Sequence, residues 1–416
     1  MNVRAGGVRL RVMTLRLLAL ALLASLLALP AAAAAQVGSR LECPPAAEIQ
    51  LLRPLASGGA AALVYYPDAG PGARISVVYP VAAPLAAVRR ALLEAERWPE
   101  FMPALRGVTT LSRRGRRAAY RIEVAASLLD VSAVTSLTEV NERRVDFAVQ
   151  ESDFGVAAAR WDLLDDGPNR TLIVTTNWSD PSQGHWLLRQ TARSNLTATA
   201  GMNVAVDLIL ALSVGRRALD LSGTRTPPRP ARVAVASPAL EAPAMGPWVS
   251  LVNDPKRYYV FAFRLADDGA VSQMTVVHHT WGRADALAAR VEGLARYGDH
   301  LPGVRATAVE GTDDRVTLAV STPLDSASGT LVRRRDASGA VLLEGTSGTL
   351  LGARWRWDIT RTEGRGTLLA LTGDVRESMA STLVRAAGGR EPYLYAGVAA
   401  IRELMWMRYM LAGIPF

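Results

Sequence analysis

Residues 77–103, VVYPVAAPLAAVRRALLEAERWPEFMP, decide how this chain folds, because residues 276–302, VVHHTWGRADALAARVEGLARYGDHLP, repeat their plan. In each stretch an apolar segment leads into a predicted helix rich in Ala, Leu and Arg, at 85–96 and at 284–296. Each stretch then ends on an aromatic and acidic segment closed by a proline, and the two prolines are 199 residues apart. The constant order predicts an internal repeat.

The repeat continues toward the end of each half. Arg160 and Trp161 in the first half correspond to Arg354 and Trp355 in the second, 194 residues later. An apolar strand and a long closing helix follow, at 171–176 and 198–219 in the first half and at 367–372 and 393–411 in the second. Several features at a nearly constant offset indicate two copies of one domain.

Between the copies lies a segment rich in proline and alanine, residues 223–247. Closely spaced prolines cannot continue a helix or a central strand, so the segment is predicted to be a semi-rigid linker. We therefore expect two separate compact domains, at 45–222 and 248–416.

The first 35 residues have the order of a secretory signal peptide. A region with four arginines precedes the apolar run from Leu17 to Leu29, and small residues up to Ala35 follow. We expect cleavage before Gln36, with a periplasmic or secreted mature protein; an uncleaved anchor is the alternative. Cys43 is the sole cysteine, so an intrachain disulfide is excluded.

Within each copy the strands alternate between apolar and polar residues. Tyr120, Ile122 and Val124 fall on one face, with Arg121 and Glu123 on the other. Strict alternation is typical of antiparallel strands with one buried face. Helices placed at both ends of a run of strands predict an α+β domain, in which a curved antiparallel sheet wraps around a long C-terminal helix.

This arrangement, with the segment Trp98-Pro99-Glu100-Phe101-Met102-Pro103 after the first helix and the Arg160-Trp161 strand before the last hairpin, resembles the START-like (SRPBCC) helix-grip superfamily. That superfamily includes polyketide cyclases and coenzyme Q-binding proteins. The resemblance implies two tandem helix-grip domains, each with an apolar cavity between sheet and helix. The second copy has Tyr297-Gly298-Asp299-His300 in place of Trp-Pro-Glu-Phe, so the first copy is the better candidate for binding.

The candidate ligand-binding residues are large apolar side chains on the predicted inner surfaces: Trp98, Phe101, Tyr120, Ile122, Phe147, Trp161, Trp355, Trp357 and Met405. Aromatic and apolar linings are typical of pockets for hydrophobic ligands. Ordinary core packing would give the same pattern. We expect a lipid, sterol, hopanoid or quinone as the partner, and transient membrane contact is compatible with such a carrier.

Other classes of function lack their residues. His278 and His279 are neighbours on a predicted strand and point to opposite faces, which predicts no shared metal ion. Neither a nucleophile elbow nor a phosphate-binding loop is present, and so no cofactor is expected. The net charge of +9 falls to +5 without the four signal-peptide arginines, and the remaining arginines do not predict a nucleic-acid-binding face.

Three functions remain open from the sequence. The favoured one is an exported carrier or binding protein for a hydrophobic molecule. The second is a cyclase- or dehydratase-like enzyme, for which Glu123, Asp130 and Asp162 are the candidate acids, although surface carboxylates are the simpler interpretation. The third is a structural or interaction module without a ligand.

Overall fold

The computed structural model describes residues 44, 46–65, 73–102, 105–126, 129–152, 156–180, 196–224, 240–241, 245–252, 258–301, 303–321, 326–363, 366–380, 385 and 393–412. The predicted signal peptide lies outside these residues, as does the predicted linker except for residues 223–224, 240–241 and 245–247. Within them, no helix combines the length and the apolar character needed to cross a membrane.

The first copy contains two helices that flank a run of strands, with short helices between. Its elements are α2 (Ala46–Leu55), β1 (Gly59–Tyr65), β2 (Arg74–Val81), α3 (Leu85–Leu93), α4 (Trp98–Phe101), β3 (Leu105–Arg114), β4 (Arg117–Ala126), β5 (Leu129–Asn141), β6 (Arg144–Ser152), β7 (Val156–Asp165), β8 (Thr171–Asp180) and α6 (Leu196–Leu221).

The second copy repeats this order element by element. Its elements are α7 (Met245–Leu251), β9 (Tyr258–Leu265), β10 (Val271–Thr280), α8 (Ala284–Glu292), α9 (Tyr297–His300), β11 (Val304–Ala308), β12 (Arg315–Ser321), β13 (Ser326–Arg335), β14 (Val341–Gly345), β15 (Arg354–Arg361), β16 (Thr367–Asp374) and α11 (Leu394–Leu411). Four 3₁₀ turns, at Ala95–Arg97, Leu294–Arg296, Gly348–Leu350 and Glu377–Met379, complete the described elements. The predicted tandem repeat of α+β helix-grip domains is therefore confirmed.

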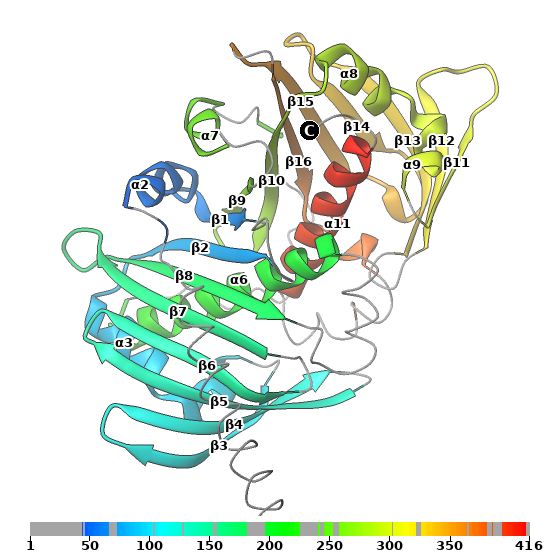
Figure 1. The fold of residues 1–416 in the computed structure, drawn as a ribbon. Helices are drawn as coiled ribbons and strands as arrows, with labels where there is room; N and C mark the ends of the chain where they lie inside the picture. Colours follow the sequence, from blue (N-terminus) through cyan, green and yellow to red (C-terminus); the bar gives the residue numbers. More distant parts are fainter. Residues whose placement is uncertain are drawn as a thin grey trace, which may run out of the picture.

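The two antiparallel sheets are joined into one. In the first copy the strand order is β1-β2-β8-β7-β6-β5-β4-β3, and the second copy has the corresponding order from β9 to β11. Strands β1 and β9 pair antiparallel, which makes a single 16-stranded sheet across both copies (Figure 1). The expectation of two separate compact domains is corrected here, because backbone hydrogen bonds connect their sheets.

The β1–β9 pair is arranged around a two-fold pseudosymmetry axis. Ala62 pairs with Phe261, which is its own counterpart 199 residues later. The hairpins agree with this offset, since Ala61 pairs with Val78 and Val260 pairs with Val277. An interface in which each residue meets its own counterpart is the isologous type found in two-fold dimers.

Alternate residues of β1 enter two different cores, one on each face of the sheet. Ala60, Ala62 and Val64 pack in the cluster that contains residues of α6 and α11. Ala61 and Leu63 pack with α2 and α7 on the opposite face. A strand buried on both faces is expected to be apolar throughout, as β1 is. The centre of the molecule thus has three layers, with the sheet between two pairs of helices (Figure 1).

Helices α6 and α11 cross at small residues. A Cβ atom on Gly201 would lie 2.8 Å from the Cα of Ile401, and one on Gly397 would lie 2.5 Å from the Cβ of Ala205. The two contacts are equivalent, because Gly397 and Ile401 each follow their counterparts by 196 residues. Close approach of the helix backbones therefore depends on the two glycines.

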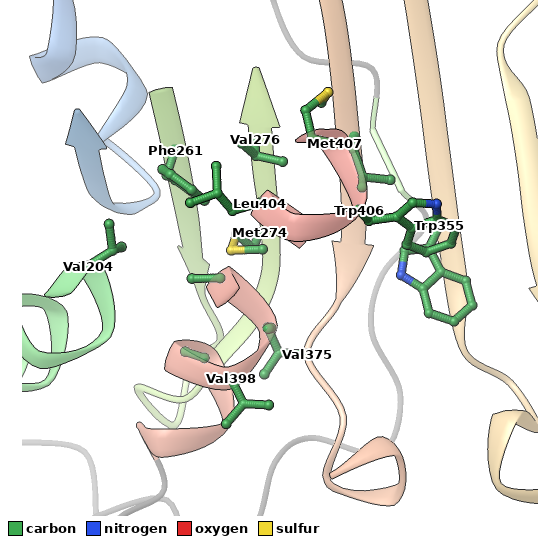
Figure 2. Packing of buried hydrophobic residues seen from close by; sticks show 14 of the residues in the cluster. Val204, Phe261, Met274, Val276, Trp355, Val375, Val398, Leu404, Trp406 and Met407 are labelled. Atoms are coloured by element: carbon green, nitrogen blue, oxygen red, sulfur yellow. The ribbon is translucent and has the colours of Figure 1, made fainter. Parts of the chain in front are cut away.

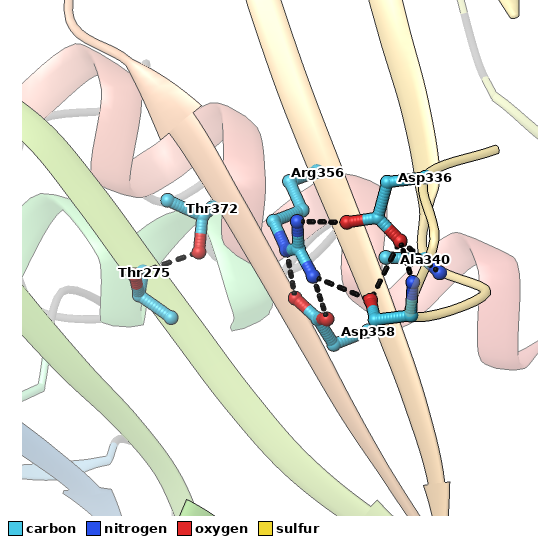
Figure 3. Close-up of polar contacts among 7 residues, drawn as sticks. Thr275, Asp336, Ala340, Arg356, Asp358 and Thr372 are labelled. Atoms are coloured by element: carbon cyan, nitrogen blue, oxygen red, sulfur yellow. Dashed lines mark hydrogen bonds and ion pairs between the residues drawn. The ribbon is translucent and has the colours of Figure 1, made fainter. Parts of the chain in front are cut away.

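The outer face of β15 carries the polar side chains that alternate with its tryptophans. Arg356 is buried and bonds Asp358 at 2.8 Å and Asp336 at 2.5 Å (Figure 3). Hydrogen bonds from Ser338, together with the Arg356 guanidinium, hold the pKa of Asp336 at about 2. Thr275 and Thr372 make a further bond of 2.8 Å between β10 and β16. The predicted alternation of this strand is confirmed, with Trp355 and Trp357 on the inner face.

Candidate ligand pocket

An apolar pocket lies in the second domain, between the outer strands of its sheet and α11. It is open at its mouth, and its cavity volume is about 100 Å³. The sheet side comes from β11, β12, β13 and β15, and the helix side from α11. The lining residues are Tyr297, Leu301, Val304, Leu318, Val320, Ala327, Leu331, Leu350, Trp355, Met379, Ile401, Arg402, Met405, Trp406 and Tyr409.

Aromatic rings form one wall of this pocket. The Trp406 ring makes edge-to-face contacts with Trp355, at 5.4 Å, and with Tyr297, at 5.8 Å, measured between ring centroids. Trp357 lies behind this wall, fully buried and 5.9 Å from Trp406. Edge-to-face pairs of this kind stabilise a rigid arrangement. Of the two tryptophans predicted to face a ligand, Trp355 therefore lines the pocket and Trp357 belongs to the core.

The helix side of the pocket follows the four-residue spacing of one face of α11. Ile401, Met405 and Tyr409 face the pocket, whereas Leu404 packs among buried residues of the central core, near Phe261 (Figure 2). Met405 thus lines the pocket, and its role in ligand binding stays a prediction. Apolar residues on both faces fit a helix that is covered by the sheet on one side and borders a cavity on the other.

A buried ion pair lies beside the aromatic wall. The Arg402 guanidinium donates to Glu403 Oε1 at 2.6 Å, and Trp355 Nε1 donates to the same oxygen at 3.0 Å. Glu403 is fully buried, and Arg402 lies 5.9 Å from the centre of the Trp355 ring. Among the described lining residues, Arg402 carries the charge, and its partner carboxylate neutralises it.

The candidate residues of the first domain lie together in a core cluster between its sheet and α6. Phe147 lies 6.0 Å from Trp98 and 6.3 Å from Trp161, measured between ring centroids. Tyr120, Ile122 and Phe101 pack in the same cluster. The structure therefore brings these residues together in the core, and their role in ligand binding stays a prediction. The pocket described above, however, lies in the second domain, and the preference for the first copy as the binding domain stays a prediction.

Each closing helix carries a buried carboxylate at the same position, and sequence reasoning did not recognise this pair. Asp207 of α6 and Glu403 of α11 are 196 residues apart, the same offset as the glycines of the helix crossing. Asn177 Nδ2 and the Thr175 hydroxyl donate to Asp207 at 3.0 and 3.2 Å. Burial raises the pKa of Asp207 to about 7, although these hydrogen bonds act in the opposite direction. The repeat offset was the signal that could have found the pair.

The carboxylates considered as catalytic acids do not gather in a cavity. Glu123 is exposed, and Asp162 is bound to Arg144 at 2.8 Å. The side chain of Asp130 lies outside the described residues. In the part of the chain that the structure describes, no three His, Cys, Asp or Glu side chains are grouped as metal ligands. The lining chemistry is therefore that of an apolar binding site.

Comparisons with known proteins gave one family match, over part of the first copy. Residues 81–212 match the model of the family described as polyketide cyclase / dehydrase and lipid transport. A search of curated proteins found no significant match.

Among solved structures, a protein from Thermus thermophilus is 20% identical (TM-score 0.31), with 36% of this chain covering 99% of that one. A START superfamily protein from Mycobacterium smegmatis is 19% identical (TM-score 0.28), with 36% and 98% covered. The di-domain ARO/CYC protein StfQ of the steffimycin biosynthetic pathway is 14% identical (TM-score 0.26), with 80% and 97% covered.

Proposed function

We propose that this protein, which consists of two START-like helix-grip domains, is an exported binding protein that carries a hydrophobic small molecule through an aqueous compartment. The observation that carries the proposal is the pocket between the outer strands of the second sheet and α11. Its wall is aromatic and aliphatic, and its one ion pair is internally neutralised. Burial of apolar ligand surface there, at roughly 25 cal/mol per Å², is sufficient for binding.

Binding is favoured over catalysis by the chemistry of the lining. A cyclase or dehydratase needs a proton donor or acceptor within hydrogen-bond reach of its substrate. In the described lining, Glu403 is covered by Arg402 and Trp355, and the Tyr297 hydroxyl donates to the Val291 carbonyl at 2.5 Å. The Tyr297 hydroxyl and Glu403 Oε1 are thus engaged with the protein itself, and Glu403 Oε2 is buried. A lipid, sterol, hopanoid or quinone is the class of ligand that such a wall would suit.

Export is proposed from the order of charged, apolar and small residues in the first 35 positions. The mature protein should begin near Gln36 and be released by osmotic shock. N-terminal sequencing and cell fractionation check this directly. Recovery of the intact N-terminus in a membrane fraction would contradict it.

Ligand binding can be tested with a fluorescent hydrophobic probe on the mature protein. We expect wild type to bind Nile red, and Met405→Asp to weaken that binding about tenfold or more, because a charge enters the apolar wall. Leu111→Asp is the control, since Leu111 is exposed on β3, away from the pocket. Phe147→Asp reports on the first domain in the same assay. A folded protein that binds neither Nile red nor any member of a lipid, sterol and quinone panel would refute the proposal.

A further inference from the structure

We infer that the pocket of the second domain selects neutral hydrophobic molecules carrying a hydrogen-bond acceptor, such as a carbonyl or hydroxyl oxygen, over lipids of the same size that carry a carboxylate. This inference rests on the proposed function and specifies its ligand class. Two observations support it: the charge balance of the pocket wall and an indole N–H that lacks an acceptor.

The charge balance disfavours an anionic ligand. Arg402 bonds Glu403 Oε1 through two of its nitrogens, at 3.0 Å from Nε and 2.6 Å from Nη2. The guanidinium is thus already matched by a fully buried carboxylate. A ligand carboxylate would have to lose its water beside Glu403, without an additional cation among the described lining residues. Burial of an unmatched charge is strongly unfavourable.

The hydrogen-bond inventory favours an acceptor on the ligand. Trp406 lines the pocket with 8% of its surface exposed, and its Nε1 has no acceptor among the described residues. Two other wall donors differ, because Trp355 Nε1 bonds Glu403 and the Tyr297 hydroxyl bonds Val291. A buried N–H without a partner costs about 1–3 kcal/mol. A ligand oxygen that reaches this buried N–H through a small shift of the wall would remove that cost.

Trp357 provides a matched control within the same aromatic cluster. Its Nε1 is also without an acceptor among the described residues, but its ring lies behind the wall and does not line the pocket. Trp406→Phe and Trp357→Phe therefore remove the same chemical group from a pocket position and from a core position.

The test measures displacement of Nile red at pH 8 by oleyl alcohol, oleate and 1-octadecene. The pocket's share of the fluorescence is the part that is lost in Met405→Asp, and displacement is measured on that part. We expect oleyl alcohol to bind about tenfold tighter than oleate. Trp406→Phe should weaken the binding of oleyl alcohol about 3- to 10-fold more than it weakens the binding of 1-octadecene, as expected for one neutral hydrogen bond. Trp357→Phe should change neither the affinity ratio of oleyl alcohol to oleate nor that of oleyl alcohol to 1-octadecene.

A charge variant tests the first observation separately. Glu403→Gln keeps an acceptor for Arg402 and Trp355 but leaves the guanidinium charge unmatched, so oleate should gain affinity relative to oleyl alcohol. Circular dichroism confirms that the variants fold. Oleate binding as tightly as oleyl alcohol in wild type would overturn this inference and leave the proposed function standing. Absence of any displaceable Nile red in wild type would overturn both.

Discussion

The crossing of α6 and α11 predicts that one added methyl group will push the two helices apart and destabilise the protein. In Gly397→Ala the new Cβ would lie 2.5 Å from the Cβ of Ala205. Carbon atoms in good contact are about 3.5–4.0 Å apart, so the helices must move apart by about 1 Å or more. Overpacking of this kind costs about 1–3 kcal/mol. The gain from replacing a helical glycine is about 0.5–1 kcal/mol, and a net loss of stability is expected.

The double variant Ala205→Gly with Gly397→Ala tests whether the contact between these two positions causes the loss of stability. Ala205→Gly alone should destabilise the protein by about 1 kcal/mol, because it places a glycine in a helix. Combined with Gly397→Ala, it moves the methyl group to the facing helix and should recover most of the loss, which a double-mutant cycle measures. The assay is urea unfolding followed by tryptophan fluorescence, with the midpoint and slope compared.

Gly246→Ala in α7 is the control for helix propensity. A Cβ on Gly246 would meet no heavy atom within 4 Å, so this change should not destabilise the protein. The reasoning would be refuted if Gly397→Ala were as harmless as Gly246→Ala, or if the two changes at the crossing were simply additive.

Three further predictions follow from the same structure. Burial raises the pKa of Asp207 to about 7 from 3.8, so between these pH values the native state binds more protons than the unfolded state. The free energy of unfolding should therefore fall as pH rises from about 4 to about 7 and then level off. Asp207→Asn should remove this pH dependence in chemical unfolding curves. A Cβ on Gly373 would lie 2.8 Å from Glu403 Oε1 and 2.9 Å from the Trp355 ring, so Gly373→Ala should weaken Nile red binding, and unchanged affinity would contradict the assigned pocket wall. The first half expressed alone, residues 45–222, would expose the edge of β1 and should self-associate in ultracentrifugation; a monodisperse monomer would show that β1–β9 pairing is dispensable.

The sequence predicted the parts of the fold that leave a periodic pattern. The closing helix expected at 393–411 is observed at Leu394–Leu411, and the alternation of Trp355 and Trp357 with arginines places both indoles on the inner face. These features are local, because side-chain period follows directly from backbone geometry. The element order could be predicted for the same reason, since it repeats along the chain.

The joining of the two sheets and the placement of the pocket could not be predicted in this way. The apolar run of β1 is compatible with any strand buried on both faces, and it does not identify β9 as the partner. The pocket depends on which side chains fill the space between sheet and helix, and these side chains differ between the copies. Asn177 of β8 corresponds to Gly373 of β16, and the Trp355 indole and Glu403 lie close to Gly373. Such differences arise from packing between distant residues, which a single sequence does not display.

The pairing of Ala62 with Phe261 has a consequence for how such a chain could arise. When each residue of a junction meets its own counterpart, one domain gene is enough to encode the whole junction, and two identical polypeptides would assemble through it unaided. A link between two such subunits lets each half mutate alone while the junction holds them together. The two halves differ in this way at equivalent positions, with Asn177 and Asp207 in the first and Gly373 and Glu403 in the second. One molecule of this kind can therefore contain two domains with the same fold but with different residues in their interiors.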